Sequence, residues 1–489
     1  MSRKSTDETL TGELLPLYVD LDGTLVKTDV AQELMLQVAT KPSLIPSLLR
    51  SLTQGVSQTK LLLSEKSTFD PETLPYNTEV LDYLSTQKSL GRRIVLASAT
   101  DRAVAHKVAN HLGIFDSVIA SSAGNNLKGL AKLKAIQADC NGEFEYIGDS
   151  SVDIPIWQAA KVCGFVNAPD SARKMTSDSQ LVSVDIQNNT RPWQSLLKAM
   201  RPHQWAKNAL ILLPLFFSHS YDAMDLMMRA LLAVLIFSIC ASAIYIFNDL
   251  MDIESDRAHA KKKSRPFAAG DLQPIFGVAA GIVMLMGGLG LSMLYFGWPL
   301  TALFGFYIVI TTLYSTWLKH KPVIDVVVLT CLYTLRIFVG GVAIGAALSP
   351  WLLNFSLFFF ASLAFMKRYT EMRRVEAAGK LKARGYLVDD MDAIRPMGIS
   401  CGGLAVLTLT LYLNSSYVAE TYNSPQILWL IAPVTMFWIF RAWLRALRDE
   451  IDDDPVVFAL KDRTSRLVLL LAVAIVITSR FLNTQGITP

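Results

Sequence analysis

The stretch LLAVLIFSICASAIYIFNDLMDIESDR, residues 231–257, decides the class of the fold. Residues 231–247 are apolar or small, which indicates a helix inside a bilayer, whose hydrocarbon core needs about 20 such residues. Asp249, Asp252 and Asp256 follow at spacings of three and four, so we expect one continuous helix to present all three on one face. Carboxylates gathered at a membrane boundary are costly without a cation. The pattern therefore predicts a membrane helix that ends in a metal site.

Apolar runs of similar length recur through residues 191–489, which we expect to form an all-α, multi-pass membrane domain. Nine candidate spans lie at about 208–222, 225–246, 272–295, 297–316, 323–346, 351–366, 396–415, 425–444 and 467–482. Lys and Arg gather in the loops after the second, fourth, sixth and eighth spans, and the intervening loops contain none. By the positive-inside rule, this asymmetry predicts a cytoplasmic N-terminal domain, a periplasmic C-terminus and a location in the bacterial inner membrane.

Residues 1–190 have the patterning of a soluble α/β domain, with charged residues, short apolar strands and amphipathic helices. At 489 residues, the chain is long enough for two domains. A net charge of only +4 indicates no nucleic-acid partner, and the scattered cysteines show no spacing of a zinc site or disulfide framework. No apolar stretch follows the basic N-terminal residues, so we expect no secretory signal.

Several apolar strands of this soluble half lead directly into polar residues. One strand continues as DLDGT at residues 20–24, a second ends at Ser98, and a later one delivers Asp149 and Asp153. The carboxyl ends of parallel strands meet at one edge of a sheet, so we expect these side chains to lie together. Carboxylate oxygens suit Mg²⁺, and a metal with a lysine would let a carboxylate approach a phosphate dianion.

This ordered set of motifs resembles the haloacid dehalogenase superfamily over about residues 14–170. The resemblance implies a Rossmann-like α/β fold in which helices at about 30–85 form a cap. It implies that Asp20 attacks phosphorus and that Asp22 is the general acid and base. It also implies that Ser98 hydrogen-bonds the phosphoryl group and that Lys132, which fits the spacing better than Lys128, neutralises phosphate charge. The implied Mg²⁺ site comprises Asp20, Asp22, Asp149 and Asp153.

The membrane acids belong to the longer run NDLMDIESDRAHAKKKSRP at residues 248–266. This run resembles the first signature of the UbiA-type polyprenyl transferase superfamily, all-helical membrane enzymes that ionise a diphosphate donor. The resemblance covers about residues 195–485 and implies that Asp249, Asp252 and Asp256 bind Mg²⁺ on that donor. Other residues that we expect to bind substrate are Lys207, Asn248, His259, Lys263, Arg265, Tyr314, Lys319, Asp325 and Arg336.

The chain departs from this superfamily after the sixth span, where members that use prenyl diphosphates carry a second aspartate-rich motif. Lys367, Arg368 and Glu371 stand there instead, and RPHQWAKN precedes the first span at 201–208. These features resemble the branch that contains decaprenyl-phosphate phosphoribosyltransferase. The resemblance implies 5-phosphoribosyl diphosphate as donor and a polyprenyl phosphate as acceptor. We then expect the cations Lys207, Lys367 and Arg368, with Glu371, at the site of the lipid phosphate.

The fusion of the two domains suggests that the phosphatase domain removes the 5-phosphate that transfer leaves on the product. The sequence leaves two alternatives open. One is prenylation of an aromatic quinone precursor, which the first membrane motif permits and the altered second motif disfavours. The other is a membrane-anchored lipid-phosphate binder without catalysis, which the complete acid sets in both halves disfavour.

Overall fold

The computed structural model describes residues 14–482, apart from residues 68, 123–124, 141, 175–179, 188–190, 219–221, 380 and 452–454. The chain divides into two compact units, Met1–Arg201 with Tyr245–Ile282, and Pro202–Ile244 with Val283–Pro489. Helix α11 therefore contributes residues to both units. The acids at its end belong to the same unit as the soluble domain.

The first unit contains a six-stranded parallel sheet with the strand order β3-β2-β1-β4-β5-β6. The strands are β1 (Leu17–Val19), β2 (Ile94–Asp101), β3 (Ser117–Ser121), β4 (Glu145–Gly148), β5 (Val162–Val166) and β6 (Leu181–Ile186). Leu17 of β1 is in register with Ile94 of β2 on one side and with Glu145 of β4 on the other. This arrangement confirms the predicted Rossmann-like fold and brings the carboxyl ends of β1, β2 and β4 together.

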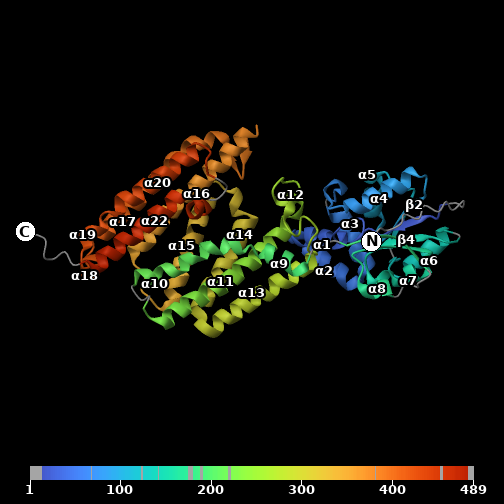
Figure 1. The fold of residues 1–489 in the computed structure, drawn as a ribbon, viewed down its shortest axis with the longest axis horizontal. Helices are drawn as coiled ribbons and strands as arrows, with labels where there is room; N and C mark the ends of the chain where they lie inside the picture. Colours follow the sequence, from blue (N-terminus) through green and yellow to red (C-terminus); the bar gives the residue numbers. More distant parts are fainter. Residues whose placement is uncertain are drawn as a thin grey trace, which may run out of the picture. The chain divides into compact units, whose positions relative to one another are not determined.

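Helices cover both faces of this sheet (Figure 1). They are α4 (Thr78–Ser89), α5 (Arg102–Leu112), α6 (Leu130–Cys140), α7 (Ile154–Ala159) and α8 (Asp170–Lys174), followed by α9 (Pro192–Met200). Leu17 and Val19 pack with residues of α4 and α5, whereas Tyr18 packs with residues of α6, α7 and α8. Burial on both faces explains why the strands are continuous apolar runs.

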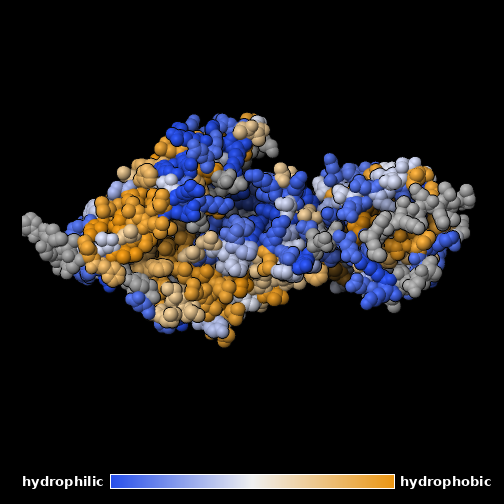
Figure 2. Space-filling view, viewed as in Figure 1, coloured by the Kyte–Doolittle hydropathy of each residue, from blue (hydrophilic) through white to orange (hydrophobic). Residues whose placement is uncertain are grey.

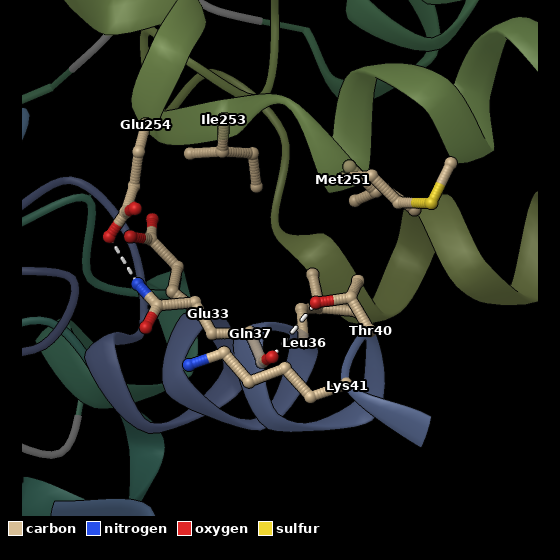
Figure 3. A pocket seen from close by; sticks show the side chains of 9 residues that line it. Glu33, Leu36, Gln37, Thr40, Lys41, Met251, Ile253 and Glu254 are labelled. Carbon is tan, nitrogen blue, oxygen red and sulfur yellow. Dashed lines mark hydrogen bonds between the residues drawn. The ribbon is translucent and has the colours of Figure 1, made fainter. Parts of the chain in front are cut away.

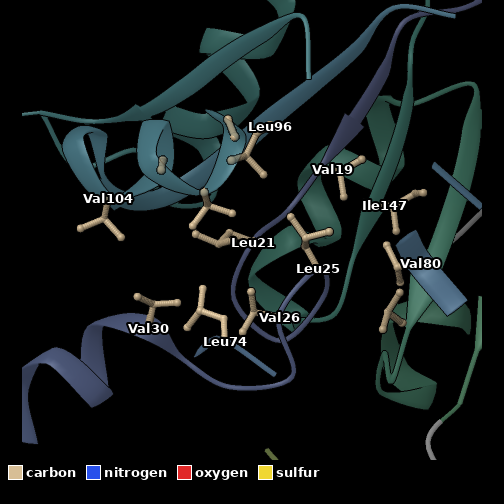
Figure 4. Packing of buried hydrophobic residues seen from close by; sticks show 14 of the residues in the cluster. Val19, Leu21, Leu25, Val26, Val30, Leu74, Val80, Leu96, Val104 and Ile147 are labelled. Carbon is tan, nitrogen blue, oxygen red and sulfur yellow. The ribbon is translucent and has the colours of Figure 1, made fainter. Parts of the chain in front are cut away.

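The loop after β1 is anchored in the apolar core between α4, α5 and the sheet. Leu21, Leu25 and Val26 of this loop are buried in that core (Figure 4). Three cap helices follow, α1 (Val30–Ala39), α2 (Ile45–Gln54) and α3 (Val56–Lys66), so the predicted helical cap is confirmed. Asp29 caps α1 by accepting a hydrogen bond from the backbone N–H of Gln32 at 3.0 Å. Asp22 and Asp29, the two acids between Leu21 and α1, therefore have fixed positions.

Eight described helices are long and apolar enough to cross a membrane, rather than the nine spans that we predicted. They are α11 (Met224–Met251), α13 (Pro274–Phe296), α14 (Trp298–Thr316), α15 (Ile324–Ile344), α16 (Pro350–Ala377), the segment Val388–Leu413 that contains α17 (Met391–Leu413), the segment Pro425–Leu447 that contains α19 (Pro425–Leu428) and α20 (Ile431–Leu447), and α22 (Arg463–Phe481). The first expected span, 208–222, instead begins in a 3₁₀ helix, Pro202–Leu212, that continues as α10, Leu213–Phe217. Pro214 removes a backbone donor at this junction, which explains the absence of one long α-helix there.

The membrane helices expose apolar side chains on their outer faces, as Figure 2 shows for the surface over α13 and α17. Only 22% of the apolar window of α13 and 17% of that of α22 is buried, against 67% for α15. Exposed apolar surface of this extent is compatible with lipid and not with water. The protein is therefore a multi-pass membrane protein, in which α15 lies in the interior of its unit. Helices α16, α17 and α20 pack around Trp443, which leaves no room for a side chain at Gly398.

Candidate functional site

Three carboxylates gather at the carboxyl edge of the sheet. Asp20 follows β1, Asp149 follows β4, and Asp153 ends the 3₁₀ turn Ser151–Asp153. Each offers an oxygen atom, and these atoms all lie within 4.8 Å of one another. Hard oxygen ligands at this spacing fit Mg²⁺. The structure thus brings together three of the four acids that we expected at this metal site.

Lys132 on α6 is the cation that faces this cluster. Its Nζ lies 2.9 Å from Oδ2 of Asp20 and 3.3 Å from Oδ1 of Asp153. Burial alone would lower the pKa of Lys132, but Asp20 and Asp153 raise it above the ordinary value, so the amine stays charged. The structure therefore places Lys132, and not Lys128, in contact with the acids.

The charge of Lys132 does not balance the three carboxylates. Burial, followed by the charges of Asp20 and Asp153, raises the pKa of Asp149 to about 8. Burial also raises the pKa of Asp20, against the effect of Lys132. A bound divalent cation would supply the missing positive charge and would favour ionisation of Asp20 and Asp149 at neutral pH. The residues present therefore fit a bound Mg²⁺.

Asp22, the fourth expected acid, is held apart from this cluster. Its Oδ1 accepts from the backbone N–H of Val30 at 2.8 Å, and its Oδ2 accepts from the hydroxyl of Thr100. Gly23 directly follows Asp22 and has φ +76°, and a Cβ there would lie 2.1 Å from Oδ2 of Asp149. Only glycine permits this close approach of the loop to Asp149.

Ser98 lies inside β2, which continues to Asp101 and so extends past the strand end that we predicted. Its buried hydroxyl accepts from the backbone N–H of Thr100 at 3.0 Å. The sequence interpretation missed Lys60 of the cap helix α3, whose Nζ donates to the carbonyl of Ala99 and, at 2.9 Å, to Oδ1 of Asn126. Burial lowers the pKa of Lys60, while the charge of Asp22 opposes this shift. A lysine within a cap helix carries no motif that would identify it.

Two of the three membrane acids, Asp249 and Asp256, converge on Arg265, although not on one continuous helix as we expected. Helix α11 ends at Met251, Asp252 occupies the junction, and α12 spans Ile253–Arg257. Arg265 bridges the two sides of this junction, because its Nη1 lies 3.0 Å from Oδ1 of Asp249 and 2.5 Å from Oδ2 of Asp256. Asp249 and Asp256 are buried, and the positive charge of Arg265 offsets their negative charges.

Arg201 is a second cation at this junction and was not among the predicted site residues. It donates to Oδ1 of Asp249 and has φ +53°, a left-handed conformation that is uncommon outside glycine. Asn248 carries a buried Oδ1 with no hydrogen-bond partner among the described residues. His259 and Lys263, which we expected to bind substrate, are exposed beside the junction.

The second unit holds a network around Arg368. Its guanidinium donates to Asp325 on α15, to Glu371 and, at 2.8 Å, to the hydroxyl of Tyr314 on α14. Tyr386 donates to the other oxygen of Asp325 at 2.6 Å. The Arg368 side chain is only 1% exposed, so in this structure it links helices, and its expected contact with a lipid phosphate stays a prediction. Its charge is already satisfied by carboxylates.

Arg336 on α15 has a different environment. It is 6% exposed, and its guanidinium lies over the rings of Phe237, Tyr307 and Tyr333 at 5.4 to 5.5 Å from their centroids. Its hydrogen bonds go to Asn208 and to the carbonyl of Leu332, and no described carboxylate pairs with it. Lys319 and Lys367 are partly exposed in the same unit. A buried arginine without an acid is costly in a membrane protein, and here the three rings and two hydrogen bonds offset part of that cost.

A family model described as the UbiA prenyltransferase family matches residues 210–461. The chain belongs to this family. A second model, haloacid dehalogenase-like hydrolase, matches residues 62–158, so this UbiA-family chain carries a fused hydrolase domain.

Three curated relatives of this UbiA-family protein differ in how much of it they match. The uncharacterized protein y4nM of Sinorhizobium fredii is 36% identical over 92% of this chain and 88% of its own length. Nodulation protein NoeC of Azorhizobium caulinodans is 33% identical over 58% of this chain and 92% of its own length. Decaprenyl-phosphate phosphoribosyltransferase of Mycolicibacterium smegmatis is 36% identical over 38% of this chain and 59% of its own length. The first relative therefore extends over both domains.

Proposed function

We propose that the membrane domain transfers 5-phosphoribose from 5-phosphoribosyl diphosphate to a polyprenyl phosphate, and that the fused domain removes the 5-phosphate of the product. The observation that carries the proposal is the chemistry of the second unit. An anionic acceptor requires buried cations, and Arg336 is a buried cation without a carboxylate partner in the described chain. The similarity to decaprenyl-phosphate phosphoribosyltransferase supports the same donor and acceptor. The domain boundary that we propose separates residues 1–190 from 191–489.

For the donor, Asp249, Asp252 and Asp256 would hold Mg²⁺, which when bound would neutralise the diphosphate leaving group. Arg265 would exchange its contacts with Asp249 and Asp256 for contacts with diphosphate oxygens, with Lys263 nearby. Asn248 would present its unpartnered Oδ1 to a donor group. The expected contact of Lys319 with the diphosphate stays a prediction.

For the acceptor, Arg336, Lys207 and Lys367 would hold the lipid phosphate. An oxygen of this phosphate forms the new bond to C1 of the ribose as the bond from C1 to the diphosphate oxygen breaks. The acceptor is already ionised, so the transfer needs no general base. Positioning and charge stabilisation then account for the rate.

For the phosphatase step, the Asp20 carboxylate would attack the phosphorus of the 5-phosphate while Asp22 protonates the ribose oxygen that leaves. Lys132 would keep Asp20 ionised and contact the phosphoryl oxygens, and Lys60 would reach the substrate from the cap. Mg²⁺ held by Asp20, Asp149 and Asp153 would supply charge neutralisation. Asp22 would then deprotonate the water that hydrolyses the phosphoaspartate.

We also propose that the membrane is the bacterial inner membrane, with residues 1–190 in the cytoplasm and the C-terminus in the periplasm. This orientation needs an odd number of crossings. The 11 residues of Pro202–Leu212 and the 5 of α10 add up to roughly 30 Å at about 2.0 and 1.5 Å per residue. That length matches the bilayer core, so this segment would provide the ninth crossing.

The experiment that tests the proposal compares two donor and acceptor pairs on the same membranes. One incubation contains ribose-labelled 5-phosphoribosyl diphosphate with polyprenyl phosphate, and the other contains labelled prenyl diphosphate with 4-hydroxybenzoate. The proposal expects label in the lipid fraction of the first only. Prenylation of the aromatic ring without ribose incorporation would establish the alternative prenyltransferase function, and no transfer in either would favour a binding protein.

A further inference from the structure

A buried ion pair joins the phosphatase cap to the transferase motif within the first unit. Nη1 of Arg257 lies 2.8 Å from Oε2 of Glu33, and Nη2 lies 2.6 Å from Oε1. The two side chains are only 6% and 9% exposed. Two parallel hydrogen bonds between buried ions fix both the distance and the orientation of the partners. Neither residue has a role in the reactions proposed above.

Both partners lie next to acids of the proposed catalytic centres. Glu33 is on α1, whose first backbone N–H, at Val30, donates to Asp22. Arg257 directly follows Asp256, which is bound to Arg265. Helix α1 therefore makes two contacts. At its start it contacts Asp22 of the phosphatase centre, and through Glu33 it contacts the acid-bearing segment of the transferase.

Further contacts hold the same surfaces together. Gln37, one turn after Glu33 on α1, donates to Glu254 of α12, and Figure 3 shows this pair beside Glu33. Gly270, with φ +75°, approaches the loop before α1 so closely that a Cβ there would lie 2.7 Å from Cβ of Lys27. A recess of about 170 Å³ remains beside Glu33, Gln37 and Glu254 (Figure 3). Polar contacts, rather than a continuous apolar core, therefore align α1 with α12 at this point.

We infer that Glu33 is a positioning residue for the transferase: through Arg257, it fixes the segment that carries Asp256. This inference rests on the proposed function of the membrane acids. Without the Glu33 carboxylate, Arg257 would face Glu254 and Asp256 instead, and the geometry of the metal-binding acids would change. A displacement of about 1 Å at a reacting centre lowers rates by about 100-fold. The phosphatase domain thus contributes a residue to the transferase that no motif of the membrane family contains.

The test uses full-length protein in lipid nanodiscs and the variants Glu33→Gln, Arg257→Gln and their combination. We expect each single variant to lower kcat for transfer by about 10- to 100-fold and to raise the Mg²⁺ concentration for half-maximal transfer several-fold. The double variant should be no worse than the poorer single one, because both remove one interaction. Glu65→Gln on the exposed face of α3 and Arg50→Gln at an exposed position of α2 are matched controls. Multiplying effects in the double variant, or an unchanged Mg²⁺ requirement, would overturn the inference.

A second measurement is independent of the donor. In the double variant Gln37→Cys with Glu254→Cys, a short bis-maleimide should join the two positions within one chain, since the native side chains are hydrogen-bonded. A lack of cross-linking above the background of the native cysteines would overturn the contact itself. If wild-type protein prenylates an aromatic acceptor instead, the proposed donor is wrong, and the same variants measured in that reaction still decide the role of Glu33.

Discussion

Nη1 of Arg265 lies 3.0 Å from Oδ1 of Asp249, and both groups belong to the junction that ends helix α11. The same nitrogen reaches Asp256, so a protein cation lies between acids that we assign to Mg²⁺. Metal binding must displace or share this guanidinium. Asp249 and Asp256 are therefore held together by an arginine that also suits the diphosphate.

Asp249→Ala and Asp252→Ala should each lower transfer by more than about 100-fold, because the donor diphosphate loses a metal ligand. Chelation of Mg²⁺ should have the same effect on the wild-type protein. Asp225→Ala, which removes an exposed acid at the other end of α11, is the control and should leave transfer unchanged. Transfer is measured as lipid-bound label in nanodiscs. Near-normal activity of either variant would show that the metal assignment is wrong.

Arg368→Met should destabilise the membrane domain, because it leaves Asp325 buried without its cation and removes the nearer of the two arginines beside Glu371. Loss of one partner of a buried ion pair costs about 3–5 kcal/mol. A lower melting temperature in detergent, relative to Arg395→Met at an exposed position, would agree with this structural role. If Arg368→Met instead has wild-type stability but no longer binds polyprenyl phosphate, Arg368 contacts the lipid phosphate as we first expected.

Mg²⁺ affinity of the phosphatase centre should fall as the pH is lowered from about 8 to 6, by up to about tenfold per unit. Without metal, the pKa of Asp149 is raised to about 8, above its unfolded value, so the folded state holds this proton more tightly. Protonated Asp149 therefore stabilises the metal-free folded protein. This stabilisation is fully present below the pKa that Asp149 has in the unfolded chain and is lost as the pH rises towards 8. Bound Mg²⁺ offsets this loss, so stabilisation by Mg²⁺ should grow with pH. Titration calorimetry measures both trends, and a pH-independent affinity would contradict them.

Lys60→Arg should move the alkaline limb of phosphatase kcat/KM to higher pH. Burial lowers the pKa of Lys60, so its charge is lost at a pH below that of an ordinary lysine, and phosphate binding weakens there. Arginine stays charged throughout this range. The pH profile of phosphomonoester hydrolysis tests this, with Lys66→Arg at the exposed end of α3 as control. If the alkaline limb lies at the same pH in Lys60→Arg and Lys66→Arg, the ionisation that causes it belongs to another group.

The phosphatase centre could be predicted from the sequence because its acids follow strands. A parallel sheet aligns the ends of β1 and β4, so the order of the motifs was sufficient to place Asp20 beside Asp149. The spacing of the membrane acids was less informative. It predicted a shared helical face for all three acids, whereas the helix ends at Met251 and only Asp249 and Asp256 are shown to converge across the break through Arg265.

Contacts between distant segments could not be predicted in this way. Glu33 and Arg257 are 224 positions apart, and each is an ordinary residue of an amphipathic helix or a basic loop. Lys60 likewise reaches the phosphatase centre only because the cap folds over it. Charge counting also favoured a phosphate contact for Arg368, since the sequence does not show that Asp325 and Tyr314 already bind it.

The most direct test of the central claim follows two labels of 5-phosphoribosyl diphosphate, radiocarbon in the ribose and radiophosphorus in the 5-phosphate. With polyprenyl phosphate and purified wild-type protein, the account predicts a lipid product that retains radiocarbon and has lost radiophosphorus. Asp20→Asn should give a product that retains both labels, because the amide cannot attack phosphorus, while transfer itself continues. Lipid without radiocarbon would contradict the phosphoribosyl transfer. Complete loss of radiophosphorus by Asp20→Asn at the wild-type rate would contradict the coupled phosphatase step.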